Sequence, residues 1–201
     1  MSAIVNLLIN LGILAICMAL HEFAHGWTAN RLGDDTAKRM GRLTLNPLAH
    51  IDPIGTVALP IILYFLTSGR FVFGAAKPVP INFLALKNPR RDIMLVGFSG
   101  PLANILSAVL AAVLFHITKA PVLIIFIGIS LSLGIFNLIP LPPLDGSRIV
   151  AGILPPQLAS KYMRIEPFGF IILLILLQFG PVNRVIWSVA DAAFKLLVSP
   201  F

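Results

Sequence analysis

The residues best suited to chemistry are His21, Glu22 and His25, which lie near the end of the first long apolar run. On an α-helix, residues four positions apart share a face, so His21 and His25 can direct two imidazole rings toward one point. Glu22 directly follows His21 and can approach the same point from the side. This spacing is typical of zinc-dependent hydrolysis, in which two histidines bind the metal and the glutamate acts as general base. The sequence therefore predicts one catalytic Zn²⁺ per chain.

A catalytic zinc site needs a third protein ligand and keeps a fourth position open for water. His21 lies about 17 residues into its apolar run, roughly 25 Å along a helix, and the run from Val122 to Ile139 has about the same length. Asp145 follows that run after a proline-rich turn, so it can meet His21 at a similar depth. Asp145 is the favoured third ligand; the alternative is a structural turn residue before Gly146.

The remaining acidic and histidine side chains are weaker ligand candidates. His116 lies at the far end of its apolar run, and Asp191 lies in the C-terminal segment. His50 and Asp52 are candidates for supporting the ligands without touching the metal. The acids that fall between apolar runs are expected to be solvated charges: Asp34, Asp35, Asp92 and Glu166.

The composition places these residues in a membrane. The chain is 58% hydrophobic and only 11% charged, whereas soluble domains carry roughly 25% charged residues. No charge occurs between Ser2 and Leu20, and several runs approach the length that crosses a hydrocarbon core of about 30 Å. We expect an all-α polytopic membrane protein with one intramembrane domain over residues 1–201. The net charge of +7 lies in the loops, which indicates membrane topology and not nucleic-acid binding.

Charge asymmetry predicts the orientation of the chain. The first apolar run, Ile4–Trp27, is followed but not preceded by basic residues. The N-terminus is therefore expected outside, in a multi-pass protein of the cell membrane with its active site toward the cytoplasm. The short run Ile54–Leu66 reaches only about 20 Å and has basic loops on both sides, which favours a re-entrant segment. The alternative is a short tilted span with the Arg70–Arg91 loop outside.

The central part of the chain predicts a helical bundle with a three-helix catalytic core. Phe71–Asn82 contains β-type residues, a glycine and two prolines, so it is interpreted as a short edge strand or loop at the membrane surface. The run Ile93–Ile117 carries Asn104, a polar residue at membrane depth that needs a partner inside the bundle or at the substrate. The segment from Phe168 to Phe201 is either one broken helix or a span followed by a surface helix.

Three motifs together resemble the site-2 proteases, a family of intramembrane zinc metalloproteases. They are the His21–His25 motif, the Gly100-Pro-Leu-Ala-Asn104 stretch, and the Asn137-x-x-Pro140 to Asp145-Gly146 stretch. The segments Gly41–Thr56 and Phe73–Asn82 resemble the small branch of the family without PDZ or CBS domains. Ala75 stands where that branch usually has tryptophan.

The resemblance implies that His21, His25 and Asp145 bind zinc and that Glu22 is the catalytic base. The expected reaction is hydrolysis of peptide bonds within or near transmembrane segments of membrane-protein substrates. Further candidates for substrate binding or transition-state support are Asn104, Asn137, Gly74 and Lys77. The alternative is a non-proteolytic membrane zinc-binding protein, or an inactive relative that only binds helices.

Overall fold

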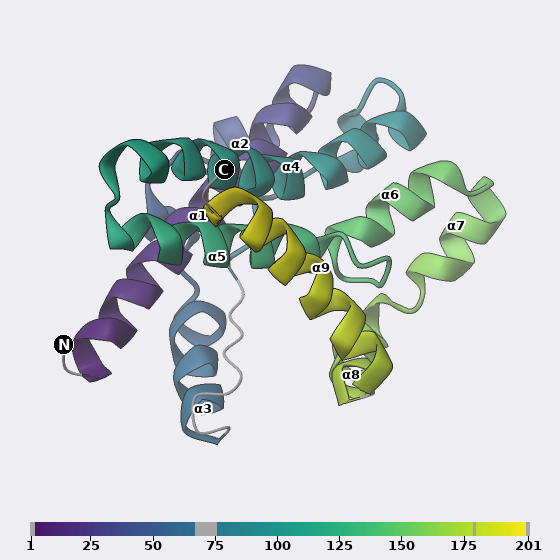
Figure 1. Cartoon of the computed structure of the whole chain (residues 1–201). Coiled ribbons are helices and arrows are strands. Elements are labelled where there is room, and N and C mark those ends of the chain that lie inside the picture. The colour runs from purple at the N-terminus through teal and green to yellow at the C-terminus, as the bar shows by residue number, and fades with distance from the viewer. Residues whose placement is uncertain (1–2, 67–75, 179, 200–201) are drawn as a thin grey trace.

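The structure is a computed structural model that describes residues 3–66, 76–178 and 180–199 (Figure 1). Its longer helices are, in chain order, α1 (Ala3–Leu32), α3 (Leu59–Leu66), α4 (Pro89–Thr118), α5 (Pro121–Asn137), α6 (Asp145–Ile153), α7 (Pro156–Met163), α8 (Glu166–Gln178) and α9 (Gly180–Val198). Short helical turns are α2 (Thr36–Arg39), η1 (Pro47–His50), η2 (Pro53–Ala58) and η3 (Phe83–Ala85). The described residues form no β-strand. The all-α fold expected from the sequence is confirmed.

Helices α1, α4 and α5 form the centre of the bundle. Helices α4 and α5 make an antiparallel hairpin, and α1 packs against both of them (Figure 1). The hairpin turns at Lys119, whose left-handed backbone ends α4. Helix α6 packs against α4, and α9 lies along α5. The bundle therefore brings the C-terminal part of α1 beside α4 and the start of α6.

Small side chains on α4 allow its close approach to α5. Ala108, Ala111 and Ala112 are buried against Ile127 and Leu131. In lipid, helices associate mainly through close packing and interhelical hydrogen bonds, which small residues permit.

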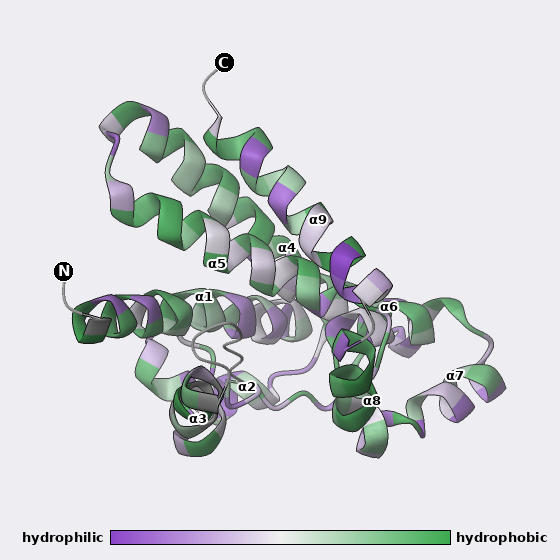
Figure 2. Ribbon diagram, turned by 60° about the horizontal axis from the view of Figure 1, so that its bottom comes forward, coloured by the Kyte–Doolittle hydropathy of each residue, from purple (hydrophilic) through white to green (hydrophobic). Residues whose placement is uncertain are grey.

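The outer surface of the bundle is apolar. Ile4 on α1 and Leu110 and Ile117 on α4 are more than half exposed, and apolar residues line the long helices in Figure 2. By length and composition, α1 and α4 are candidate membrane spans and α5 is a shorter apolar helix. A surface of this kind is suited to lipid and would be a liability in water.

The short second apolar run forms the π-helical turn η2 and then helix α3. Eight residues of helix reach about 12 Å, less than one crossing. Helix α3 projects away from the central helices in Figure 1. That it re-enters the membrane stays a prediction. Of the predicted edge element, residues 71–75 lie outside the described residues, and residues 76–82 form neither a helix nor a strand.

The C-terminal segment contains two helices bent by 82° relative to each other, α8 and α9. Helix α9 returns along α5, where Phe194 and Leu197 pack against the cluster around Ile127. The segment therefore consists of two helices joined at a sharp bend, which fits both sequence interpretations.

Two acids that were expected to be solvated are buried. Asp34 and Asp92 are each 1% exposed. The Asp34 carboxylate accepts hydrogen bonds from the backbone N–H groups of Thr36 and Asn82, at 2.9 and 2.7 Å. Asp92 accepts from the Asn88 N–H at the start of α4, at 2.8 Å. The expectation was wrong because a short carboxylate near a helix end finds backbone donors that sequence spacing does not reveal.

Candidate metal centre

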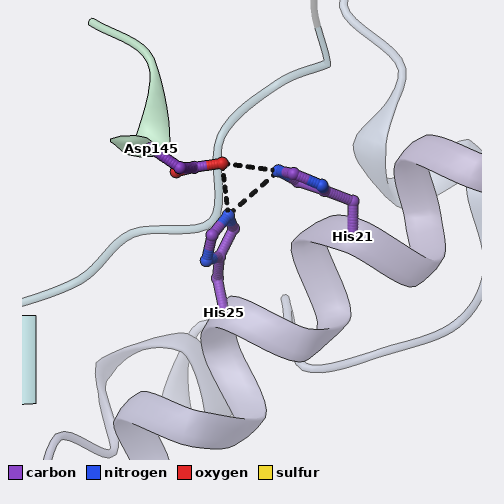
Figure 3. Close-up of side chains that lie close together, drawn as sticks. All are labelled: His21, His25 and Asp145. Atoms are coloured by element: carbon purple, nitrogen blue, oxygen red, sulfur yellow. Dashed lines mark hydrogen bonds and ion pairs between the residues drawn. The ribbon is translucent and has the colours of Figure 1, made fainter. Parts of the chain in front are cut away.

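Three side chains converge between α1 and α6. His21 and His25 project from one face of α1 toward the carboxylate of Asp145, the first residue of α6 (Figure 3). The His21 Nε2 and Asp145 Oδ2 atoms are 2.9 Å apart, and the two Nε2 atoms are 3.0 Å apart. The His25 Nε2 lies 3.2 Å from the same carboxylate oxygen. The three residues that the sequence nominated as ligands therefore meet at one point.

The hydrogen bonds of the two imidazoles fix which nitrogen carries the proton. His25 Nδ1 lies 2.7 Å from the Val96 carbonyl oxygen, which can only accept, so Nδ1 is protonated. His21 Nδ1 lies 2.8 Å from Asn104 Oδ1, which also accepts. In the neutral rings, both Nε2 atoms consequently direct lone pairs toward Asp145. Histidine ligands are commonly fixed in this way by a partner at the other ring nitrogen.

The donor set fits a zinc ion. Three electron-rich atoms about 3 Å apart repel one another unless a cation lies among them. Zinc binds imidazole nitrogen and carboxylate oxygen at about 2.0–2.2 Å in a tetrahedral arrangement, which places neighbouring ligand atoms roughly 3.3–3.6 Å apart. The observed spacings of 2.9, 3.0 and 3.2 Å are shorter than that range by a few tenths of an ångström, so a small outward shift of the side chains would admit the ion. Two neutral imidazoles and one carboxylate are a ligand set that zinc prefers.

Asn104 is oriented by a polar network in the middle of the bundle. It is fully buried, and its amide nitrogen donates to the Cys17 carbonyl and to Ser130 Oγ, at 3.3 and 3.2 Å. Ser130 in turn donates to the Asn104 carbonyl at 2.9 Å, and Ser107 joins the network at Ser130. The amide thus makes the interhelical hydrogen bonds that were one of the two expectations for it. Asn104 acts on the centre through His21.

Glycines on α4 let the other helices reach the centre. A Cβ atom at Gly100 would lie 2.7 Å from His21 Nε2 and 2.6 Å from His25 Cε1, which is closer than atoms can approach. At Gly97, a Cβ would lie 3.0 Å from the Asp145 carbonyl oxygen. The two glycines therefore make room for the imidazoles and for the start of α6.

Asp145 is held in its ionised form by its surroundings. Although burial alone would raise the pKa of this carboxyl, the imidazoles of His25 and His21, when they are protonated in the absence of a metal, hold its pKa below the usual range. The next residue, Gly146, is buried, and a Cβ there would meet the Ile139 carbonyl oxygen at 2.5 Å. The glycine therefore lets α6 begin tightly against the end of α5.

Glu22 lies beside the centre without entering the group of three. One of its carboxylate oxygens, Oε2, accepts a hydrogen bond from the Val79 backbone N–H at 2.7 Å. This contact joins α1 to the extended segment 76–82. The sequence analysis did not identify Val79 as a partner of Glu22; the one available signal was the pair of prolines around it, Pro78 and Pro80.

The other nominated residues lie away from the three ligands. Asn137 donates to the Leu133 carbonyl of its own helix at 2.9 Å. The Lys77 side chain is exposed, and Gly74 lies outside the described residues. The two candidates for outer support, His50 and Asp52, are engaged locally with Thr44 and with Gly55 and Thr56. His116 bonds the Leu197 carbonyl on α9, at the far end of α4.

Comparisons with known proteins give a consistent result. The model of "Peptidase family M50" matches residues 116–177. The Bacillus subtilis protein named "Putative zinc metalloprotease YwhC" is 38% identical over 202 residues, covering 94% of this chain and 88% of that protein. The protein named "Putative zinc metalloprotease Rip2" from Mycolicibacterium smegmatis is 32% identical, covering 83% of this chain and 65% of that protein. Rip2 of Mycobacterium tuberculosis H37Rv is 29% identical, with coverages of 90% and 71%. No solved structure shows significant similarity.

Proposed function

This chain belongs to peptidase family M50, the site-2 protease family, and from that membership we propose that it cleaves peptide bonds within or near transmembrane segments of other membrane proteins. It is a membrane zinc metalloprotease, in keeping with its family, its similarity to the named metalloproteases and its apolar helices. The proposal concerns the substrate class, the residues that act and the side of the membrane on which they act.

We infer that His21, His25 and Asp145 hold the zinc. The observation that carries this inference is the convergence of two fixed imidazole lone pairs and one carboxylate oxygen on a single point. Glu22 directly follows His21 on α1. Its carboxylate is not among the three ligands, so it is available for proton transfer. That combination supplies a metal, a base and a fourth position for water.

The bound zinc would supply Lewis-acid chemistry, lowering the pKa of a water molecule and polarising the scissile carbonyl. Glu22 accepts the proton of the attacking water and then donates it to the leaving amine. Asn104 and the Val96 carbonyl keep the two imidazoles in the tautomers that leave Nε2 free. Val79 holds one oxygen of Glu22, which leaves the other for proton transfer.

A transmembrane substrate must unwind locally before cleavage, because a helix keeps its carbonyl groups in internal hydrogen bonds. An extended segment of the enzyme can receive the unwound strand by edge pairing. Residues 71–82 are the proposed receiving segment. Within residues 76–82, the N–H groups of Lys77, Val79 and Asn82 and the carbonyls of Lys77 and Pro78 already have partners, so pairing would use the remaining backbone groups of the segment.

The end of the bundle that holds the centre is proposed to face the cytoplasm, with the N-terminus outside. Basic residues gather where α1 ends and α4 begins, as the positive-inside rule requires of a cytoplasmic end. They are Arg31, Lys38, Arg39, Arg42, Lys87, Arg90 and Arg91. Water would then reach the centre from that side.

The Glu22→Gln variant tests the assignment of the base. The amide is close in shape, so the variant should bind zinc as well as the wild type but fail to cleave a transmembrane substrate in proteoliposomes. Glu166→Gln, at an exposed position on α8, is the matched control and should cleave normally. Cleavage by Glu22→Gln at the wild-type rate would contradict the mechanism. A wild type that binds zinc but cleaves no transmembrane substrate would favour a zinc-binding protein without protease activity.

A further inference from the structure

The backbone segment beside Glu22 is held by residues far from the zinc ligands. Arg42, which follows α2, donates through Nη2 to the carbonyl oxygens of Lys77 and Pro78, at 2.8 and 3.4 Å. The Lys77 N–H donates to the His50 carbonyl at 2.9 Å. These contacts hold the N–H and the carbonyl of Lys77 and the carbonyl of Pro78, which is bonded to Val79. Val79 in turn donates to Glu22.

Val79 carries the one backbone N–H group of residues 78–80. It stands between Pro78 and Pro80, and proline has no backbone N–H. Val79 therefore supplies the one N–H in this three-residue stretch. The prolines also restrict the backbone to extended conformations, so the donor has little freedom to turn away.

The Val79 side chain fixes the same segment on the face of α1 that carries Glu22. Val79 is 5% exposed, and a Cβ atom at Gly26 would lie 3.0 Å from its Cγ1 atom. Gly26 and Glu22 are four residues apart and so share one helix face. The side chain rests over the glycine while the N–H reaches the carboxylate one turn earlier.

We propose that Arg42 is a positioning residue for Glu22, acting through the main chain of residues 77–79. A glutamate side chain has several rotatable bonds, so a proton-transferring carboxylate needs an external partner to hold its orientation. Val79 holds Oε2, and Arg42 holds the peptide units that place Val79. Oε1 is left to serve the reacting water. This proposal rests on the proposed role of Glu22 as the base.

The test compares the zinc-loaded Arg42→Ala, Arg42→Lys and Arg39→Ala proteins in proteoliposomes containing a transmembrane substrate. Arg39 is the matched control because it belongs to the adjacent turn α2 and its side chain pairs with Asp35 at the surface, away from residues 77–79. Arg42→Ala should lower kcat on the order of tenfold while leaving KM and zinc content unchanged. Arg42→Lys should restore part of kcat, because lysine can still donate to one carbonyl. Arg39→Ala should behave as the wild type.

Two further measurements keep the proposal testable if Arg42→Ala folds poorly. Hydrogen exchange at the Val79 amide should become about tenfold faster in Arg42→Ala, with or without zinc, since the partner at Glu22 is no longer aligned. Val79→Pro removes the donor and should lower kcat far more than Val79→Ala, which keeps the donor and trims the side chain.

Three results would overturn the proposal. One is wild-type kcat and wild-type Val79 exchange in a folded Arg42→Ala protein. Another is a loss confined to KM or to zinc content. The third is an increase in rate, which would make the Val79 contact inhibitory. If Glu22→Gln is inactive while Arg42→Ala is normal, only the positioning role fails; if Glu22→Gln is fully active, the proposed base fails as well.

Discussion

Replacing Asn104 with leucine should weaken zinc binding without touching a ligand. The change keeps a similar volume but removes the acceptor for His21 Nδ1–H, which lies 2.8 Å away. A buried donor without a partner costs about 1–3 kcal/mol. Loss of a partner that orients a metal ligand typically weakens metal affinity by about 10–100-fold, or roughly 1.4–2.7 kcal/mol. The two magnitudes agree, so we expect the zinc Kd to rise by about 10–100-fold.

The assay is competition for zinc between the purified full-length protein and a chromogenic chelator, with the unfolding temperature measured in parallel. Asn137→Leu is the matched control, because the Asn137 amide donates to the Leu133 carbonyl of its own helix and not to a ligand. Its zinc Kd should not change. A folded Asn104→Leu protein with a zinc Kd within about twofold of the wild type would refute the reasoning that Asn104 fixes His21.

Further predictions concern close packing, a buried acid and the metal itself. Gly100→Ala should bring zinc content well below one ion per chain at unchanged helicity, since its methyl group would lie 2.7 Å from His21 Nε2; full zinc occupancy would contradict the packing argument. Asp34→Asn should lower the free energy of unfolding by about 1–3 kcal/mol, measured by denaturant titration, because an amide nitrogen replaces an oxygen that accepts from Thr36 or Asn82. Chelation should lower the unfolding temperature of the wild type. Zinc at 100 times its Kd contributes about 2.7 kcal/mol, and no shift would mean that zinc does not bind the folded state preferentially.

Helical periodicity and segment length were sufficient to predict that His21, His25 and Asp145 lie close together. His21 and His25 share a face because they are four residues apart, and equal run lengths placed Asp145 at the depth of His21. In the structure these three side chains meet. Their role as zinc ligands stays a prediction, and so does the base role of Glu22.

Contacts between side chains and the backbone could not be predicted from helical periodicity or segment length. Asp34 was expected to be solvated because it falls between apolar runs, yet its partner Asn82 is 48 residues away. The pairing of Glu22 with Val79 spans 57 residues. A main-chain N–H exists at almost every position, so residue type carries little information about which one is used. The two prolines around Val79 were the one available signal, because they leave a single donor.

The zinc motif on α1 decides which helix carries the ligands, but α4 decides whether those ligands are usable. Both Nδ1 atoms bond to α4, His21 to Asn104 and His25 to the Val96 carbonyl. Without these partners, each neutral imidazole could carry its proton on Nε2 and present no lone pair to a metal. Gly100 lies between the two partners and clears the space that the rings occupy. If His21 and His25 bind zinc as proposed, their readiness to do so depends on the α1–α4 contact, and we expect that a substitution on α4 can abolish zinc binding while every ligand remains in place.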